Sequence, residues 1–208
     1  MKAHTKETQA AMTPVTAIEA LKAGNQRFVE NKQVARDLLD QVNDTSTGQY
    51  PFATILSCID SRVSAELVFD QGVGDIFSAR VAGNFVNEDI LGSMEFACKL
   101  AGTKVIVVLG HTACGAVKGA CDDAKLGNLT ALLSKIKPAV EAVKEPSNPA
   151  DRTSKNISFV NEVAEKNVHM TIDNIRKESP VLKEMEDMGQ INIVGAMYDI
   201  NDGKVTFM

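Results

Sequence analysis

The sequence has no tryptophan and only two tyrosines, and aromatic residues make up 5% of its 208 positions. It also lacks any apolar run near the ~20 residues that a membrane-spanning helix needs. Its polar first residues contain no apolar signal-peptide core. Lysine and arginine number 22 against 27 acidic residues, a formal net charge of -5. We therefore expect neither a membrane protein nor an exported one, and no cationic surface for nucleic acid.

Cysteine is also scarce, and its four positions are informative. A chain of this length buries enough core to fold without disulfides, so we expect reduced thiols and a cytoplasmic protein. In that setting, cysteines near a histidine indicate a metal site or catalysis more often than cross-linking. Cys98 and Cys121 lie in apolar helical patterns, which favours packing as small buried side chains. Cys58 and Cys114 are left as candidates for chemistry.

Short apolar runs alternate with helical patterns, which is typical of right-handed βαβ units. The last two runs flank a turn and read as a hairpin. Strands are predicted at 53–57, 75–81, 104–109, 191–198 and 204–207. Helices are predicted at 14–31, 87–100, 129–143 and 153–177, with another from 180.

No repeat or linker divides the chain, so we expect one domain over residues 1–208. Residues 1–13 read as a polar leader, and 43–49 as a polar loop. The predicted fold class is α/β, a central and mostly parallel β-sheet with an antiparallel C-terminal edge, flanked by helices.

Two segments carry the chemistry, and each follows a predicted strand. Cys58 and Asp60 come after the first strand, and His111, Cys114 and Gly115 come after the third. Ligands of open α/β sheets bind beyond the carboxyl ends of the strands, so the two loops can converge. Two cysteines and a histidine suit zinc, and three protein ligands leave a fourth position for water. The sequence therefore predicts a catalytic zinc site.

Asp60 is close enough in sequence to Cys58 to reach the same metal. Its carboxylate could fill the fourth position or accept a hydrogen bond there. Pairing with Arg62 would hold it away from the metal and ionised. A simpler interpretation is a helix cap and a surface ion pair. The backbone N–H groups that begin at Gly115 could donate to an anionic substrate oxygen.

These segments resemble the β-class carbonic anhydrases. The resemblance rests on Cys58-x-Asp60-Ser-Arg62, followed by His111-x-x-Cys114 in a Gly-His-Thr-x-Cys-Gly setting. Stretches at 66–70, 74–77, 80–84 and 198–200 also agree, and the similarity runs from about Pro14 to the C-terminus.

The resemblance implies reversible hydration of carbon dioxide to bicarbonate and a proton, by zinc-bound hydroxide. It implies one Zn²⁺ per subunit, with Cys58, His111 and Cys114 as ligands and Asp60 with Arg62 as the catalytic dyad. It also implies an obligate dimer, a homodimer or homotetramer, with the helix at 14–31 packed on the partner subunit.

Two subtypes of the family differ at the fourth position. In the closed subtype a tryptophan, an arginine and a tyrosine bind bicarbonate while the aspartate becomes a zinc ligand. Here Ile55 replaces the tryptophan, although Arg80 and Tyr198 match the other two. Asp60 would thus be a ligand only in a closed form.

The open, plant-like subtype fits better. It has a substrate-binding glutamine, matched by Gln49, and an apolar wall, matched by Phe77. Its tyrosine from the neighbouring subunit falls on Phe96, which lacks the hydroxyl. We expect the open form, with Gln49, Phe77 and Gly115 binding substrate.

Other functions remain open at this stage. The same site could hydrolyse carbonyl sulfide or carbon disulfide. A structural or redox zinc domain would fit if Asp60 were a permanent fourth ligand. Nucleotide binding rests on the fold class alone, since Gly72-Val-Gly74 lacks the spacing of a dinucleotide fingerprint. His169 could act as a proton shuttle.

Overall fold

Two short apolar strands form the centre of the computed structural model, which describes residues 2–208. Every residue of β1 (Ala53–Ser57) and β3 (Val105–His111) is buried. Such continuous apolar runs are typical of parallel strands covered on both faces. The two strands pair in parallel, with Ser57 opposite Leu109. Their carboxyl ends therefore lie side by side at one end of the sheet.

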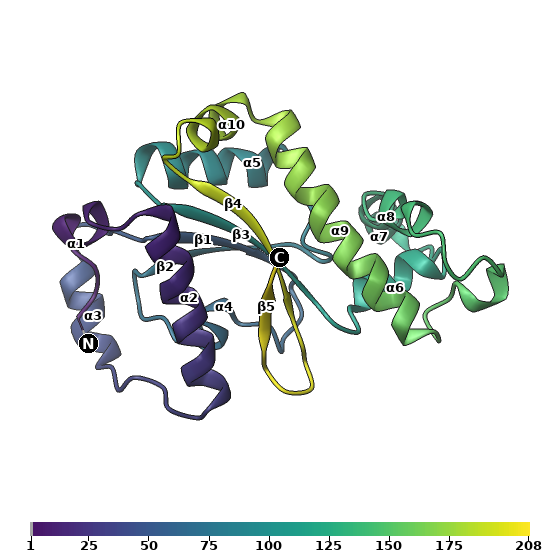
Figure 1. Ribbon diagram of the computed structural model, residues 1–208, viewed down its shortest axis with the longest axis horizontal. Helices are drawn as coiled ribbons and strands as arrows, with labels where there is room; N and C mark the ends of the chain where they lie inside the picture. The colour runs from purple at the N-terminus through teal and green to yellow at the C-terminus, as the bar shows by residue number, and fades with distance from the viewer. Residues whose placement is uncertain (1) are drawn as a thin grey trace.

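Three further strands complete a five-stranded sheet in the order β2-β1-β3-β4-β5 (Figure 1). They are β2 (Ile76–Arg80), β4 (Asn192–Tyr198) and β5 (Val205–Phe207). The first four strands run parallel, and β5 runs antiparallel to β4. The predicted fold class is confirmed.

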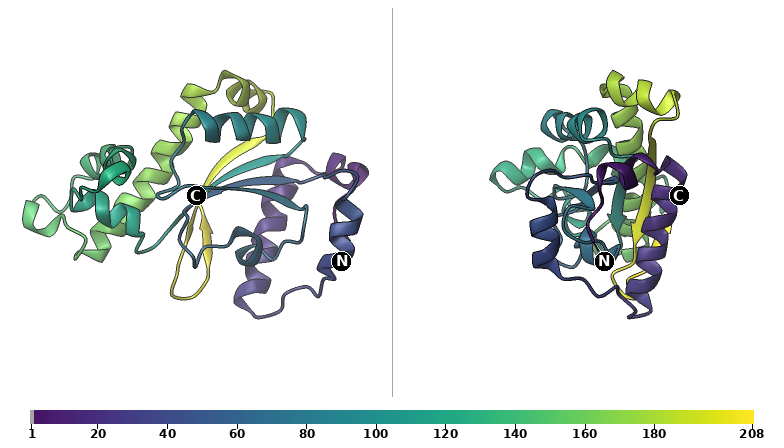
Figure 2. Two further views of the ribbon diagram at one scale, coloured as in Figure 1. Left: turned by 180° about the vertical axis from the view of Figure 1, so that it is seen from behind. Right: turned by 90° about the vertical axis from the view of Figure 1, so that its left-hand side faces the viewer.

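Helices cover both faces of the sheet (Figure 2). On one face, Leu21 packs with Ile55 and Val107. On the other, Val168 packs with Ile106. The covering elements are α2 (Pro14–Val29), α4 (Ala65–Val68), α5 (Glu88–Glu95), the π-helical turn η1 (Phe96–Leu100), α9 (Ile157–Glu178) and α10 (Pro180–Asp187). None of the helices in residues 2–208 combines the length and apolar character needed to cross a membrane.

A separate group of helices packs on the first half of α9, beyond the carboxyl end of the sheet (Figure 1). It consists of α6 (Gly115–Cys121), α7 (Gly127–Leu133) and α8 (Lys137–Ala142), followed by the 3₁₀ turn η2 (Pro149–Asp151). The single helix predicted at 129–143 is therefore wrong. Pro138 lies in the first turn of α8, and its ring would clash with a carbonyl one turn earlier in a continuous helix.

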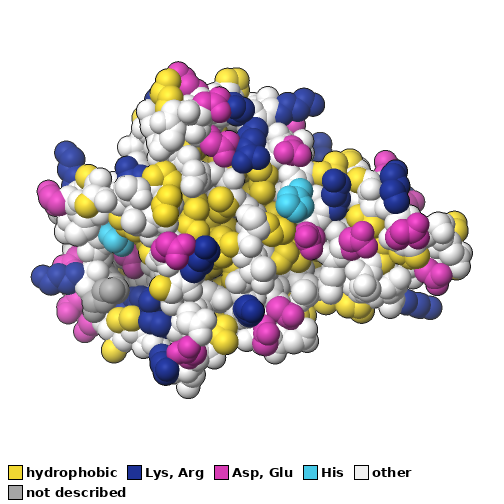
Figure 3. Space-filling view, viewed as in Figure 1, with side chains coloured by type: hydrophobic (Ala, Val, Ile, Leu, Met, Phe, Trp, Pro, Cys, Tyr) yellow, Lys and Arg dark blue, Asp and Glu magenta, His cyan; other side chains and the backbone are white. Residues whose placement is uncertain are grey.

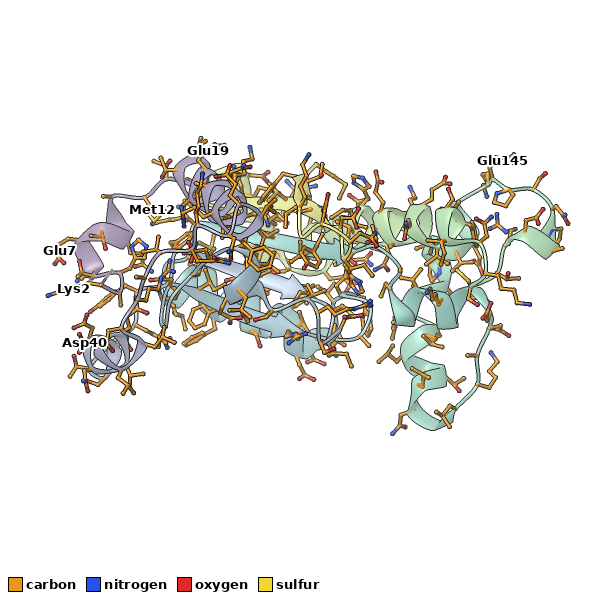
Figure 4. The ribbon with its side chains drawn as sticks, turned by 90° about the horizontal axis from the view of Figure 1, so that it is seen from below. Lys2, Glu7, Met12, Glu19, Asp40 and Glu145 are labelled. Carbon is orange, nitrogen blue, oxygen red and sulfur yellow. The ribbon has the colours of Figure 1, made fainter. Side chains whose placement is uncertain are left out.

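The polar N-terminal segment is more structured than its composition suggests. It contains α1 (Lys6–Ala10), which begins with a capping box at Thr5. The buried Gln9 Nε2 donates to the carbonyls of Pro51 at 2.6 Å and Ala101 at 2.8 Å. This segment therefore docks beside the start of β1. Figure 4 shows Lys2 and Glu7 at the end of the molecule opposite Glu145, which follows α8.

The helices α3 (Leu38–Thr45) and α2 can be compared with the elements predicted from the sequence. The helix α3, capped by Asp37, takes in the start of the loop expected at 43–49. The helix α2 begins at Pro14 as predicted and buries Ala17 and Leu21 in its own subunit. Its packing on a partner subunit stays a prediction.

Asp70 links α2 and the segment after it to the loop between α4 and β2. Its carboxylate accepts hydrogen bonds from Arg27 Nε at 2.5 Å, from Arg36 Nη1 and from the Val34 N–H at 3.2 Å. Burial raises the pKa of Asp70, but Arg27 and Arg36 outweigh burial and hold that pKa below its ordinary value. The carboxylate is therefore an ionised centre of a largely buried cluster.

We predict that Asp70→Asn lowers the free energy of unfolding by about 3 kcal/mol at neutral pH, because Arg36 would keep a buried charge without its carboxylate partner. Urea unfolding measures this loss. The pKa of Asp70 is lower in the folded protein than in the unfolded chain. Its contribution to the free energy of unfolding is therefore fully present above the pKa of the unfolded state, ~3.9, and is lost as the pH falls below that value. The difference between Asp70→Asn and the unaltered protein should shrink over that range.

The control is Asp187→Asn, which removes an exposed carboxylate paired with Lys183 on α10. We expect a change of ~0.5 kcal/mol or less from this exposed pair. Equal losses in the two variants would contradict a special role for Asp70.

Candidate metal centre

The structure brings the three predicted ligands together at the carboxyl end of the sheet. Cys58 directly follows β1, His111 is the last residue of β3, and Cys114 is the N-cap of α6. The ligand atoms of all three residues lie within 4.8 Å of one another, and the two sulfur atoms are 3.9 Å apart. All three side chains are buried. Parallel pairing of β1 with β3 is the reason that residues 53 positions apart converge.

The imidazole of His111 presents one nitrogen to this cluster. Its Nδ1 lies 3.0 Å from the carbonyl oxygen of Thr112, which favours the tautomer with the proton on Nδ1. Its Nε2 is buried and has no hydrogen-bond partner in the part of the chain described. A buried polar atom without a partner costs free energy, and a metal ion would satisfy it.

The sulfur geometry also fits zinc. Two thiolates at ~2.3 Å from a tetrahedral zinc ion would lie ~3.8 Å apart, close to the separation seen here. The hydrogen bond between the two sulfur atoms, together with those from His111 and the Gly83 N–H, lowers the pKa of Cys58 to about 4. The same hydrogen bond, together with burial, raises the pKa of Cys114. The pair therefore shares a proton that a divalent cation can replace.

Asp60 and Arg62 form the predicted pair beside the cluster. Arg62 Nε donates to Asp60 Oδ1 at 2.9 Å and its Nη2 to Oδ2 at 2.8 Å, and the Arg62 N–H also reaches Oδ1 at 3.0 Å. These contacts hold the pKa of Asp60 well below its usual range. Asp60 Oδ2 lies 3.9 Å from His111 Nε2, outside hydrogen-bond range. The carboxylate is thus adjacent to the cluster but turned toward Arg62.

Arg80 has a role that the sequence did not reveal. Its Nε donates to the carbonyl of Cys58 at 2.9 Å, and its Nη2 to the carbonyl of Asp60 at 2.7 Å. The resemblance had suggested Arg80 only as part of a bicarbonate site. A usable signal was its place at the end of β2, where the register sets it opposite Ser57.

The predicted substrate-binding residues lie in different places. Gly115 is the exposed first residue of α6, next to Cys114, with open space where a side chain would be. Gln49 lies four residues before β1, whereas Cys58 follows this strand, which is ~16 Å long. Phe77 pairs with Thr54, three residues before the end of β2. Within one subunit, Gln49 and Phe77 are therefore not brought to the metal ligands.

Phe77 instead lines a cleft of about 690 Å³ between β2 and α5. Its ring lies 6.2 Å from that of Phe96, centroid to centroid, in an edge-to-face arrangement. Ile55, at the position of the missing tryptophan, is fully buried in the same apolar cluster as Tyr198.

The other cysteines and histidines stand apart from the cluster. Cys98 is buried and Cys121 half-buried, and burial raises the pKa of each to about 11. Both therefore pack as thiols, as expected. His169 is exposed on α9, and the ring of His4 packs 5.2 Å from that of Phe52.

Comparisons with known proteins agree with this geometry. The family model for carbonic anhydrase matches residues 53–205, a range that contains the whole cluster. Carbonic anhydrase 2 of Mycobacterium tuberculosis is 38% identical over 92% of this chain and 91% of its own. The structure of the β-carbonic anhydrase CcaA superimposes with a TM-score of 0.71 at 25% identity, over 93% of each chain.

A tetrameric β-carbonic anhydrase of Sordaria macrospora shares the fold, with a TM-score of 0.67 at 24% identity, over 78% of this chain and 83% of its own. The family match spans most of the chain and contains the Cys58, His111 and Cys114 cluster. The protein belongs to the β-class carbonic anhydrases.

Proposed function

We propose that this protein catalyses the reversible hydration of carbon dioxide to bicarbonate and a proton, with one Zn²⁺ per subunit held by Cys58, His111 and Cys114. The observation that carries this proposal is a buried cluster of two sulfur atoms and His111 Nε2, which has no hydrogen-bond partner within residues 2–208, in a member of this family. Zinc at such a site activates water as a nucleophile near neutral pH, as is known from carbonic anhydrases with three histidine ligands.

Asp60 and Arg62 decide how many protein ligands the site has. Three ligands leave a position for reactants, whereas structural zinc sites have four. Arg62 binds both oxygens of Asp60 and keeps the carboxylate ionised, so Asp60 can accept a hydrogen bond but not donate one. Arg80 donates hydrogen bonds to the carbonyls of Cys58 and Asp60 and so fixes the backbone of Asp60. These contacts support the open form and a catalytic rather than structural site.

Gly115 is our candidate for binding an oxygen of the substrate. Its N–H belongs to the first turn of α6, where helix N–H groups lack partners within the helix. The space around its α-carbon is open, so a small molecule can approach the backbone. We assign Gly115 a role in orienting carbon dioxide or bicarbonate.

Gln49 and Phe77 do not lie beside the metal ligands of their own subunit. They can bind substrate only if they reach the metal centre of a second subunit. The outer side of β2 has no neighbouring strand in residues 2–208. Large apolar side chains are exposed on elements at or near this side: Leu38, Leu39 and Val42 on α3, Leu67 on α4, and Phe96 and Leu100 on η1. Exposed apolar surface of this extent is typical of an interface. We therefore propose a homodimer in which Phe77 and Gln49 line the partner's substrate pocket.

A second apolar area supports a larger assembly. Figure 3 shows apolar side chains gathered between α2 and α9 at the centre of one face. Val15 on α2 is exposed, as is Met208, whose N–H donates to the Gly195 carbonyl of β4, and Val194 of β4 is half-buried. We propose that two dimers meet on this face as a homotetramer.

All four cysteines are free, which supports a reducing compartment such as the cytoplasm.

Removing a metal ligand is the direct test. We expect zinc-loaded protein to hydrate carbon dioxide in stopped-flow measurements between about pH 6.5 and 9. Cys58→Ser and His111→Ala should reduce the rate to background and abolish stoichiometric zinc, because each removes one of three ligands. Cys121→Ser is the control and should keep both, since Cys121 lies outside the cluster. Zinc-loaded protein that shows no hydration across this range would refute the proposal.

The Asp60–Arg62 pair makes a separate prediction about pH. In Arg62→Ala the Asp60 carboxylate loses its partner, and it lies only 3.9 Å from His111 Nε2. We expect it to occupy the open position and lower activity near pH 7 by ~10–100-fold, with recovery at alkaline pH. The unaltered protein should not show this low-pH loss, because the depressed pKa of Asp60 keeps the pair intact throughout the range.

The control is the double variant Arg62→Ala with Asp60→Asn, since an amide is a poor zinc ligand. This variant should lack the strong dependence on pH. If Arg62→Ala alone keeps the pH profile of the unaltered protein, the arginine does not hold the site open.

A further inference from the structure

The helix α9 connects the sheet to the α6–α8 group and contacts β3, β4, α6 and α8 (Figure 1). Two asparagines on it, Asn161 and Asn167, bond to loops of the metal centre rather than to the helix itself. Asparagine is a poor helix former, and of the three asparagines in α9 only Asn174 is exposed to solvent.

Asn161 supports the turn that carries His111 and Cys114. Its Oδ1 accepts a hydrogen bond from the N–H of Ala113 at 2.8 Å. Ala113 lies between the two ligands with a φ of 54°, a left-handed conformation that alanine rarely adopts. The hydrogen bond from α9 therefore stabilises the turn that sets the spacing between His111 and Cys114.

Asn167 supports Cys58 through one intermediate. This asparagine is 3% exposed, and its Nδ2 donates to the carbonyl of Gly83 at 2.8 Å. The N–H of Gly83 in turn donates to Cys58 Sγ at 3.4 Å. Gly83 has a φ of 80°, and an added Cβ would lie 2.3 Å from Ile136 Cδ1. Gly83, whose N–H reaches the sulfur, is therefore held through its carbonyl by Asn167 and lies against Ile136 of the core.

We propose that Asn161 and Asn167 are positioning residues for the metal centre. They lie ~9 Å apart along one helix, and through Ala113 and Gly83 that helix sets where Cys58 stands relative to His111 and Cys114. The inference rests on the proposed function, in which these three residues bind zinc. Hydrogen-bonded partners of this kind orient metal ligands and tune their donor strength.

The two asparagines use opposite chemistry, and this makes the test specific. Asn161 accepts a hydrogen bond, so Asn161→Asp keeps the interaction and Asn161→Ala removes it. Asn167 donates, so Asn167→Asp places a carboxylate oxygen against the Gly83 carbonyl. Aspartate should thus be tolerated at position 161 and not at position 167. Asn174→Asp adds the same charge to an exposed position of α9 and is the matched control.

The measurements are zinc affinity, by competition with a chromophoric chelator, and the visible spectrum of the Co²⁺-substituted protein. Asn161→Ala and Asn167→Asp should bind zinc ~10–100-fold more weakly, whereas Asn161→Asp and Asn174→Asp should match the unaltered protein. The thiolate-to-cobalt charge-transfer band should shift in Asn167→Asp, which loses the oriented N–H at Cys58 Sγ, and stay in place in Asn174→Asp.

Unchanged zinc affinity in Asn161→Ala and Asn167→Asp would overturn the proposal. So would an Asn161→Asp variant as weak as Asn161→Ala, because the acceptor would then be irrelevant. If Asn167→Asp fails to fold, the two Asn161 variants still decide between these outcomes. Failure of the unaltered protein to bind zinc is a different result, and it would refute the proposed function instead.

Discussion

The parallel pairing of β1 with β3 is the constraint on which the metal centre depends. It sets Ser57, the last residue of β1, opposite Leu109, and β3 continues for two more residues, so that His111 lies close to Cys58. A slip of either strand by one residue would exchange the side chains packed beside α2, such as Ile55, with those packed beside α9, such as Leu56, and both closely packed cores would have to rearrange. The ligand distances are thus a consequence of core packing as much as of the loops.

The polar groups around the cluster offset the free-energy cost of burying its polar ligand atoms. Two sulfurs and an imidazole nitrogen are buried at the end of an apolar core, and His111 Nε2 has no partner within residues 2–208. Burial of unpaired polar atoms is unfavourable. The structure tolerates it because Arg80, Thr112 and the Gly83 N–H fix the surrounding backbone and the imidazole tautomer. The arrangement of these donor atoms suits a small tetrahedral cation.

Much of this was accessible from the sequence, for identifiable reasons. The strands were predictable because β-branched runs such as 104–109 have few other stable arrangements. The ligands were predictable because Cys58, His111 and Cys114 each follow or end such a run. The break at Pro138 was also visible in the sequence, but the helix predicted at 129–143 did not take this proline into account. The supports at Asn161 and Asn167 were not predictable, because each acts through a backbone group on a segment distant in sequence. For Arg80 the signal was limited to its place near the end of a predicted strand, which does not identify the carbonyls that it binds.

The division of labour between subunits follows from the same strand geometry. A parallel strand places residues at its two ends far apart, so a chain that binds metal after β1 cannot also reach that metal with Gln49, four residues before β1. The same holds for Phe77, which the register sets opposite Thr54 rather than Ser57. Phe77 lies on the outer strand of the sheet, beside the exposed Phe96. An apolar wall for carbon dioxide built from these rings requires a second copy packed against β2. In the proposed homodimer the metal ligands would belong to one subunit, whereas the complete substrate pocket would need both.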